Sequence, residues 1–217
     1  MLEKSQFVTK VYATVGGALI LSALTAFFAS TSPAILAWLA NSATMIAIAV
    51  IDLILVAVLT FAWRKLSPTA ATLCLALYAL LDGLLLSSIF LIYDFGSVIS
   101  IFFACAGLFI LLALFSRSPF IDTSHWGSIL TIGLLCIIVM GIVNVFLGSS
   151  LLHQLLSGAG LAIFVGITIY DQQKINELAD AHHRYHDQLV VPMALSLYLD
   201  FINIFLRLLE LFGKRDD

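Results

Sequence analysis

The sequence has few charged residues. It carries 10 Lys and Arg and 13 Asp and Glu among 217 residues, or 11%, whereas a soluble domain carries about 25%. Hydrophobic residues make up 62%, which is more apolar surface than a water-soluble globule of this length can bury. The scarcity of charge therefore excludes a soluble enzyme, a disordered chain and a basic nucleic-acid-binding protein. It indicates a polytopic membrane protein.

Short catalytic motifs are also missing. The chain has no GxGxxG, no P-loop and no HExxH. Its three cysteines, at 74, 105 and 136, lie far apart in apolar segments, which is typical of core residues rather than of catalysts. His182, His183 and His186 form an HHxxH pattern with metal-compatible spacing, but a solvated loop is the preferred interpretation because ligand types alone are a weak signal. We therefore predict no enzyme activity, no resident cofactor and no certain metal site.

Lysines and arginines are separated by long gaps. None lies between Lys10 and Arg64, between Lys65 and Arg117, or between Arg117 and Lys174. About 20 apolar residues cross a bilayer core of about 30 Å, so each gap holds two spans and a loop. A seventh apolar segment follows. The predicted fold is an all-α, seven-helix transmembrane bundle, one domain over residues 1–217, with spans near 11–30, 43–63, 69–93, 98–116, 127–147, 152–173 and 192–212.

The loops that carry Lys and Arg all fall on one side of this arrangement. The positive-inside rule then places the N-terminus in the cytoplasm. Two alternatives stay open. The first span resembles a signal peptide, although its apolar run of about 19 residues is longer than a typical h-region. The last segment either spans the membrane or forms half of a re-entrant pair, because the charge of the C-terminal tail is balanced.

Six charged residues fall inside the predicted spans. Each costs at least about 2.5–3.5 kcal/mol near the bilayer centre unless it is paired, protonated or hydrated, so such residues normally face a bundle interior or a watery path. A polar clamp that holds helices together without any transport role is the alternative. The six residues are Asp52, Asp82, Asp171, Asp200, Arg207 and Glu210.

The seventh segment places its polar residues on one face. Pro192 can begin this helix and Gly213 can end it. Between them, polar side chains recur at intervals of 4, 3, 4 and 3 residues, which is helical spacing, so we expect this stripe to face other helices or a cavity. Glu210 can pair with Arg207. The stripe consists of Ser196, Asp200, Asn203, Arg207 and Glu210.

Asp171 and Asp200 are predicted at similar depth. They lie about 9 Å and 12 Å from the cytoplasmic ends of two helices that share one loop, and Arg64 ends the second span on the same side. Neighbouring carboxylates in a low dielectric share a proton, which suits a pH-sensitive gate; a static hydrogen-bonded pair is the alternative. Asp52 and Asp82 lie deeper, and their oxygens favour Ca²⁺ or protons over zinc or copper.

Several segments resemble the Bax inhibitor-1 family, also called the transmembrane Bax inhibitor motif family. The last helix is the most specific match, with Asp200 inside the sequence LYLDFIN. Ser88 stands where many family members carry proline. The similar segments are PMALSLYLDFINIFLRLLELFG (192–213), IYDQQKI (169–175), GIVNVF (141–146) and GLLLSSIF (83–90).

The resemblance implies a seven-helix bundle with its last helix at the centre and a pH-sensitive Ca²⁺ leak. In the bacterial branch, paired aspartates match Asp171 and Asp200 as pH sensor, and an arginine matching Arg64 is the latch of the closed state. It also implies an integral protein of the bacterial inner membrane. Some bacterial relatives interact with an FtsH-type membrane protease of the AAA class.

The sequence therefore favours a passive, pH-gated cation pathway, with lipid, Ca²⁺ and protons as partners and no nucleic acid. Asp52 and Asp82 are its candidate ion-path residues. The second hypothesis is a non-transporting regulator that binds another membrane protein, such as the protease. A proton-coupled transporter and an intramembrane enzyme rank lower, because neither broken helices in matching halves nor a nucleophile–base pair is visible.

Overall fold

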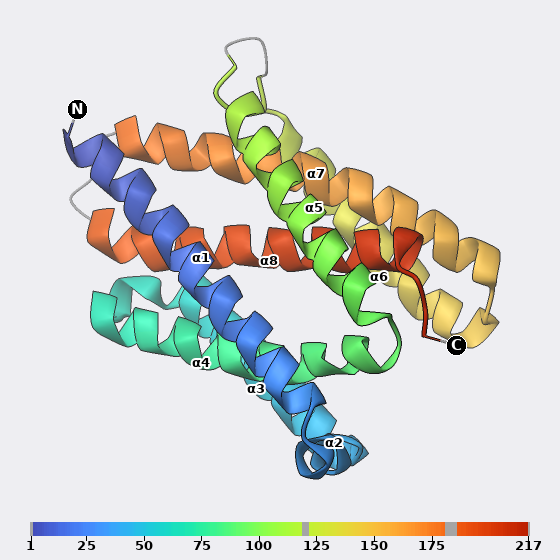
Figure 1. The fold of residues 1–217 in the computed structure, drawn as a ribbon. Helices are drawn as coiled ribbons and strands as arrows, with labels where there is room; N and C mark the ends of the chain where they lie inside the picture. Colours follow the sequence, from blue (N-terminus) through green and yellow to red (C-terminus); the bar gives the residue numbers. More distant parts are fainter. Residues whose placement is uncertain (1, 119–121, 181–185, 217) are drawn as a thin grey trace. The chain divides into compact units, whose positions relative to one another are not determined.

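Helices account for nearly all of the chain. The computed structural model describes residues 2–118, 122–180 and 186–216. These residues form no β-strand, only one isolated bridge between Tyr93 and Arg215. Figure 1 labels the α-helices. In chain order the elements are α1 (Leu2–Ser30), α2 (Pro33–Leu39), α3 (Ser42–Phe61), the 3₁₀ helix η1 (Trp63–Lys65), α4 (Pro68–Leu86), the 3₁₀ helix η2 (Ser87–Leu91), α5 (Phe95–Phe115), α6 (Trp126–Leu147), α7 (Ser150–Asp180) and α8 (His186–Phe212).

Seven of the described helices are long and apolar enough to cross a membrane, α2 being too short. Large apolar side chains such as Phe61 and Phe146 are 84% and 86% exposed, an arrangement that suits lipid rather than water. The predicted all-α, seven-span fold class is confirmed. α8 is the most buried span. Of the residues in its most apolar stretch, 61% are buried, against 0–33% for the other six spans.

Local capping residues explain where two of the spans begin. The Ser67 hydroxyl accepts a hydrogen bond from the Ala70 N–H at 3.2 Å, and Pro68 is the first residue of α4. The Asn41 side chain caps α3 in the same way, because its Oδ1 accepts from the Ala43 N–H at 2.9 Å. Both caps satisfy N–H groups that lack a partner in the first turn of a helix.

Two helix ends differ from the sequence-based expectation. α7 continues past 173 to Asp180, and α8 begins at His186, so Pro192 lies inside α8 and does not start it. A proline inside a helix removes one backbone hydrogen bond, which neighbouring helices can compensate in a membrane bundle. The extra turn of α8 is held to α1, where Lys10 Nζ donates to Asp187 Oδ1 at 2.7 Å.

The helix that begins at Pro68 changes from an α-helix to a 3₁₀ helix at Ser87. There α4 gives way to η2, although no proline is present. The Ser87 and Ser88 hydroxyls donate to the backbone oxygens of Leu84 and Leu85 at 2.6 and 2.9 Å. Serine side chains that bond to their own helix in this way compete with the backbone ladder, which explains a tightened turn at this point.

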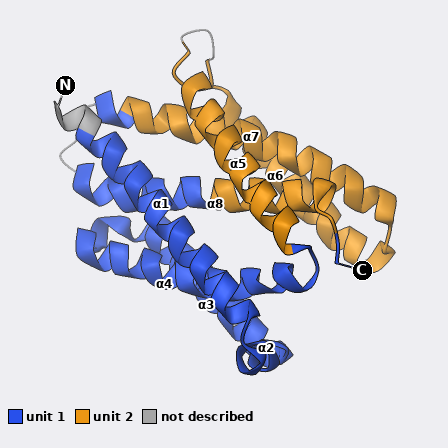
Figure 2. Cartoon of the chain, viewed as in Figure 1, with its two compact units in different colours: residues 1–94, 178–198, 215–217 blue, residues 95–177, 199–214 orange. Residues whose placement is uncertain are grey.

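Helices of the chain gather into two compact units (Figure 2). Unit 1 holds residues 1–94, 178–198 and 215–217, and unit 2 holds residues 95–177 and 199–214. The boundary falls within α8, between Tyr198 and Leu199. The single transmembrane domain stays a prediction.

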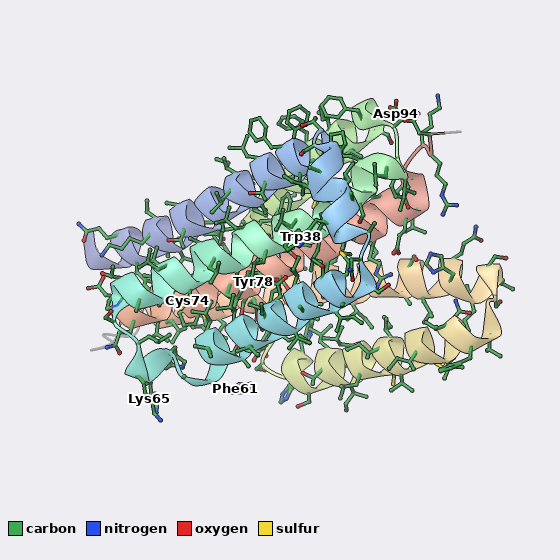
Figure 3. All side chains as sticks on the ribbon, turned by 90° about the horizontal axis from the view of Figure 1, so that it is seen from below. Trp38, Phe61, Lys65, Cys74, Tyr78 and Asp94 are labelled. Atoms are coloured by element: carbon green, nitrogen blue, oxygen red, sulfur yellow. The ribbon has the colours of Figure 1, made fainter. Side chains whose placement is uncertain are left out.

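In unit 1, α4 packs between α1 and α3 (Figure 3). Gly83 makes the close approach of α4 to α1 possible, because a Cβ there would come within 2.6 Å of the Ser22 backbone oxygen. The same view shows Lys65 and Asp94 at opposite ends of this unit. Beyond α8, the N–H of Asp216 donates to the Ile92 backbone oxygen at 3.1 Å.

In unit 2, α6 and α7 pack through small residues on both helices. A Cβ at Gly133 would come within 2.8 Å of Ile163 on α7, and one at Gly166 within 2.8 Å of Leu130 on α6. Aromatic side chains join α5 to α8. The Phe201 ring lies 5.3 Å from Phe102 and 5.7 Å from Phe109, in edge-to-face arrangements that aromatic pairs favour.

The three cysteines differ in their surroundings. Cys105 is buried in unit 2, and its thiol donates to the Phe201 backbone oxygen at 3.6 Å. Cys74 is half-buried on α4. Cys136 is exposed on α6, so the expectation of a core position is wrong for this residue. A cysteine is apolar enough to face lipid, so a lipid-facing position on α6 needs no burial within the protein.

Candidate functional site

The polar stripe of α8 meets a second stripe on α7. Within unit 2, Asp200 is near Thr168 and Asp171, Arg207 packs on Gly160, and Glu210 bonds to Ser157. As the numbering rises on α8 it falls on α7, so the two helices run antiparallel. The stripe on α7 recurs at helical intervals: Ser157, Gly160, Phe164, Thr168 and Asp171.

One end of this α7–α8 seam holds the two aspartates expected to pair. Asp171 and Asp200 interact electrostatically, and the Thr168 side chain is hydrogen-bonded to Asp200. Asp200 is only 3% exposed, and its Oδ2 is buried with no hydrogen-bond partner among the described residues. The structure therefore brings together a buried carboxyl group, Asp200, and a half-buried one, Asp171, and the buried one is incompletely satisfied.

The other end of the seam is a closed polar network. Glu210 Oε2 accepts hydrogen bonds from Arg207 Nη1 and from the Ser157 hydroxyl, both at 2.7 Å. Ser157 is buried, and the Arg207 side chain lies against Gly160, where a Cβ would come within 3.1 Å of its Nε. The i, i+3 pair expected from the sequence is present, and it also reaches across to α7.

The remaining members of the predicted stripe have local roles. Asn203 uses its Nδ2 to donate to the Leu199 backbone oxygen at 2.7 Å, one turn back on α8. Ser196 is half-buried and belongs to the part of α8 that lies in unit 1. Neither side chain makes a described bond to another helix.

Arg64 lies in η1, on the exposed connection between α3 and α4. Its guanidinium carbon is 5.1 Å from the centre of the Trp63 ring, a cation–π distance. The described residues include no ion pair of Arg64. Arg64 belongs to unit 1 and the aspartate pair to unit 2, so the latch stays a prediction.

Unit 1 contains a second buried polar cluster. Tyr198 on α8 donates its hydroxyl to Asp82 Oδ2 on α4 at 2.6 Å, and the Ser22 side chain on α1 is hydrogen-bonded to the same tyrosine. Asp52 on α3 interacts electrostatically with Asp82. Tyr78 completes the cluster, with its ring 5.5 Å from that of Tyr198; Figure 3 labels Tyr78 on α4.

The histidine pattern lies mostly outside the described residues. His182 and His183 are among those not described, so the predicted weak metal site cannot be assembled from them. His186 is described: its Nε2 is 2.9 Å from the Leu178 backbone oxygen, and its ring stacks on Phe7 at 4.9 Å. In the described part of the chain, no three His, Cys, Asp or Glu residues cluster as metal ligands.

Sequence reasoning missed the partners of the acidic residues. Thr168 and Ser157 share a helix face with Asp171, at intervals of three or four residues, so the stripe on α7 was visible as a periodic pattern. Gly160 belongs to the same series. Tyr198 gave no such signal, because it lies two residues from Asp200 and therefore off the polar stripe of α8.

Comparison with known proteins covers nearly the whole chain. The family model described as "Inhibitor of apoptosis-promoting Bax1" matches residues 4–217. An uncharacterized protein of Borreliella burgdorferi is 36% identical over 219 residues, covering 99% of this chain and 94% of the relative. Inner membrane protein YbhL of Escherichia coli is 36% identical over 217 residues, covering 96% and 92%.

A relative from Streptococcus pyogenes gives the same result. The uncharacterized membrane protein SpyM3_0260 of Streptococcus pyogenes is 33% identical over 216 residues, covering 98% of this chain and 94% of the relative. The names of two of these relatives, which call them membrane proteins, agree with the seven apolar helices. The chain belongs to the Bax inhibitor-1 family of integral membrane proteins.

Proposed function

We propose that this chain forms a pH-gated passive pathway for cations, with Ca²⁺ as the transported ion, in the bacterial inner membrane. The observation that carries the proposal is the Asp171–Asp200 pair in unit 2, in which Asp200 is buried and Asp171 is half-buried. Intramembrane acids of this kind normally mark an ion or proton path rather than a lipid-facing surface. The inner-membrane location is supported by the name of the relative YbhL.

Protonation of the pair supplies the gate. Two carboxylates in a low-dielectric interior repel each other when both are ionised, so they share a proton when protons are abundant. Loss of that proton leaves a negative charge that attracts a cation. In this proposal Arg64 is that cation, and it latches the closed state when the pair is ionised. The leak therefore increases as the pH on the latch side falls.

Incomplete hydrogen bonding in the α7–α8 seam gives a reason why the gate would respond to the charge of the aspartate pair. Asp200 Oδ2 has no hydrogen-bond partner among the described residues, so the protein compensates the ionised form only in part, through Thr168. An incompletely compensated carboxylate changes its energy strongly with protonation state. Asp52 and Asp82 are the proposed path residues in unit 1.

Ca²⁺ flux into proteoliposomes across a range of pH tests the proposal. The native protein is expected to leak more at acidic pH, and Asp171→Asn/Asp200→Asn is expected to leak at a rate independent of pH. Glu177→Gln is the matched control, because it also neutralises an acid on α7 but lies exposed beyond the pair. Arg64→Gln is expected to leak at alkaline pH as the native protein does at acidic pH.

Two outcomes would contradict the proposal. Absence of flux at every pH, from protein that is folded in the vesicle, would remove the pathway. An unchanged pH profile in the double variant would clear the aspartate pair of the sensor role. Absence of flux together with co-purification of a membrane-anchored AAA protease would favour the non-transporting regulator.

A further inference from the structure

Unit 1 contains a groove between α1, α4 and α8 that the proposed cation pathway does not use. Its volume is about 500 Å³. Val190 and Val191 of α8 line it and are 8% and 1% exposed. Lys10 on α1 and Asp187 on α8 also line it, and both are exposed. The groove therefore combines an apolar wall with a charged rim.

The groove lies where three of the candidate spans begin. The apolar stretches that border it start at Gln6, Pro68 and His186. Lys10 and Thr72 line the groove four residues after the first two of these starts, about 6 Å along each helix axis. The headgroup layer on each face of a bilayer is roughly 5–7 Å thick. The groove is therefore at the boundary between lipid headgroups and acyl chains.

The two charged residues of the groove balance each other. Lys10 Nζ donates to Asp187 Oδ1 at 2.7 Å, and the two side chains are 57% and 73% exposed. Among the described residues that line the groove, these two are the ones that carry a charge. An exposed ion pair contributes little to stability, so both side chains can exchange partners with a ligand. The lining has no net charge and therefore does not favour a purely anionic ligand.

The polar side chains of the groove include more acceptor groups than donor groups. The Lys10 ammonium has three N–H donors and gives one of them to Asp187, which only accepts. The hydroxyls of Thr14 and Thr72 donate to backbone oxygens of their own helices at 2.8 and 2.9 Å, so their oxygens are left to accept. A matching ligand therefore needs an acidic group for Lys10 and an N–H donor group for the carboxylate and the hydroxyls.

We propose that this groove binds a zwitterionic phospholipid whose headgroup carries a primary ammonium, of the phosphatidylethanolamine type. The phosphate accepts hydrogen bonds from Lys10, the ammonium donates to Asp187 and to the threonine hydroxyls, and an acyl chain lies along Val190 and Val191. A phosphatidylglycerol headgroup offers no ammonium to Asp187, and a phosphatidylcholine headgroup offers no N–H donor. The site shares no residue with the proposed cation pathway and does not depend on it.

Native mass spectrometry of the purified full-length chain, titrated with phospholipids of identical acyl chains, tests the site. We expect phosphatidylethanolamine to bind about tenfold more tightly than phosphatidylglycerol or phosphatidylcholine, because either competitor loses a charge-assisted hydrogen bond. Lys10→Gln is expected to weaken the binding of phosphatidylethanolamine about tenfold, and Asp187→Asn to remove the preference over phosphatidylcholine. Lys10→Arg is expected to bind as the native protein does, since a guanidinium also holds a phosphate.

Two controls and a blocking variant separate this site from the lipid that surrounds any membrane protein. Lys174→Gln and Glu177→Gln each neutralise an exposed residue of α7 and are expected to bind phosphatidylethanolamine as the native protein does. Ala13→Leu enlarges an apolar side chain that lines the groove without changing its charge, and is expected to weaken binding as Lys10→Gln does. Added phosphatidylethanolamine is expected to raise the thermal midpoint of the native protein in detergent more than that of Asp187→Asn.

Tighter binding of phosphatidylglycerol than of phosphatidylethanolamine would overturn the inference, because the groove would then be an anion site. Equal binding of phosphatidylethanolamine by the native protein, Asp187→Asn and Ala13→Leu would also overturn it, because the lipid would then bind elsewhere. The inference fails as well if Lys10→Gln and Asp187→Asn lower the thermal midpoint in lipid-free detergent but leave the lipid preference unchanged. The Lys10–Asp187 pair would then only hold α1 to α8.

Discussion

The two ends of the α7–α8 seam use the same helices for opposite purposes. At one end Glu210 accepts bonds from Arg207 and Ser157, both at 2.7 Å, so its charge is balanced by its neighbours. At the other end Asp200 lies beside a second acid, Asp171, and keeps an oxygen without a partner among the described residues. A balanced network holds helices together, whereas an unbalanced one responds to protons.

This comparison predicts that two substitutions that each remove a carboxylate differ in their effect on the free energy of unfolding. Glu210→Ala leaves the Arg207 guanidinium without its carboxylate, so we expect a loss of about 2 kcal/mol in the free energy of unfolding, as for other hydrogen bonds to charged groups. Asp200→Asn removes a charge that was already poorly compensated, so its stability is expected not to fall. Unfolding of both variants in detergent, followed by circular dichroism, measures the difference.

The pH dependence of the leak gives a second test of the difference between the Glu210 end and the Asp200 end of the seam. Glu210→Ala is expected to keep the pH midpoint of the native protein, because the altered group lies away from the sensor pair. An equal loss of stability in the two variants, or a displaced midpoint in Glu210→Ala, would show that the two ends act as one network.

Thr168→Val tests the partial compensation of Asp200. The Thr168 hydroxyl, which also lies 2.7 Å from the Phe164 backbone oxygen, is hydrogen-bonded to Asp200 and favours its ionised form, so its removal is expected to move the midpoint of the leak to higher pH. Ca²⁺ flux at closely spaced pH values measures the displacement. Thr131→Val on α6 is the matched control, because its hydroxyl bonds only to the Gly127 backbone oxygen.

Gly160→Ala is expected to have the smallest effect. The added Cβ would meet the Arg207 side chain at 3.1 Å from Nε, but a long side chain can shift by a few tenths of an ångström. The gain in helix propensity, about 1 kcal/mol, offsets this contact. We expect the free energy of unfolding to change by less than about 0.5 kcal/mol. A loss of several times that amount would mean that Arg207 has no freedom to move.

Periodicity predicted one half of the seam and not the other. The intervals between Ser196 and Glu210 identified the polar face of α8, because helical geometry fixes which residues share a face. They did not identify α7 as its neighbour, since the packing partner of a helix depends on the whole bundle. The depth estimate for Asp171 and Asp200 used helix ends that the structure moves to Asp180 and His186.

Unit 1 shows a different limit of sequence reasoning. Asp52 and Asp82 were recognised because charge is rare inside apolar spans. Tyr198 was not, because a tyrosine in an apolar helix is ordinarily a core aromatic residue. Only the approach of α8 to α4, which places its hydroxyl 2.6 Å from Asp82 Oδ2, distinguishes this tyrosine from the others.

The short tail after α8 has a practical consequence for anyone who attaches a reporter to this protein. Its backbone pairs with the connection between η2 and α5, through Asp216 and Ile92 and through the Tyr93–Arg215 bridge. Seven crossings, with the last helix spanning the membrane and not re-entrant, would put the two chain ends on opposite membrane faces. A fluorescent or protease-sensitive fusion at the C-terminus should therefore report from the compartment that an N-terminal fusion does not reach.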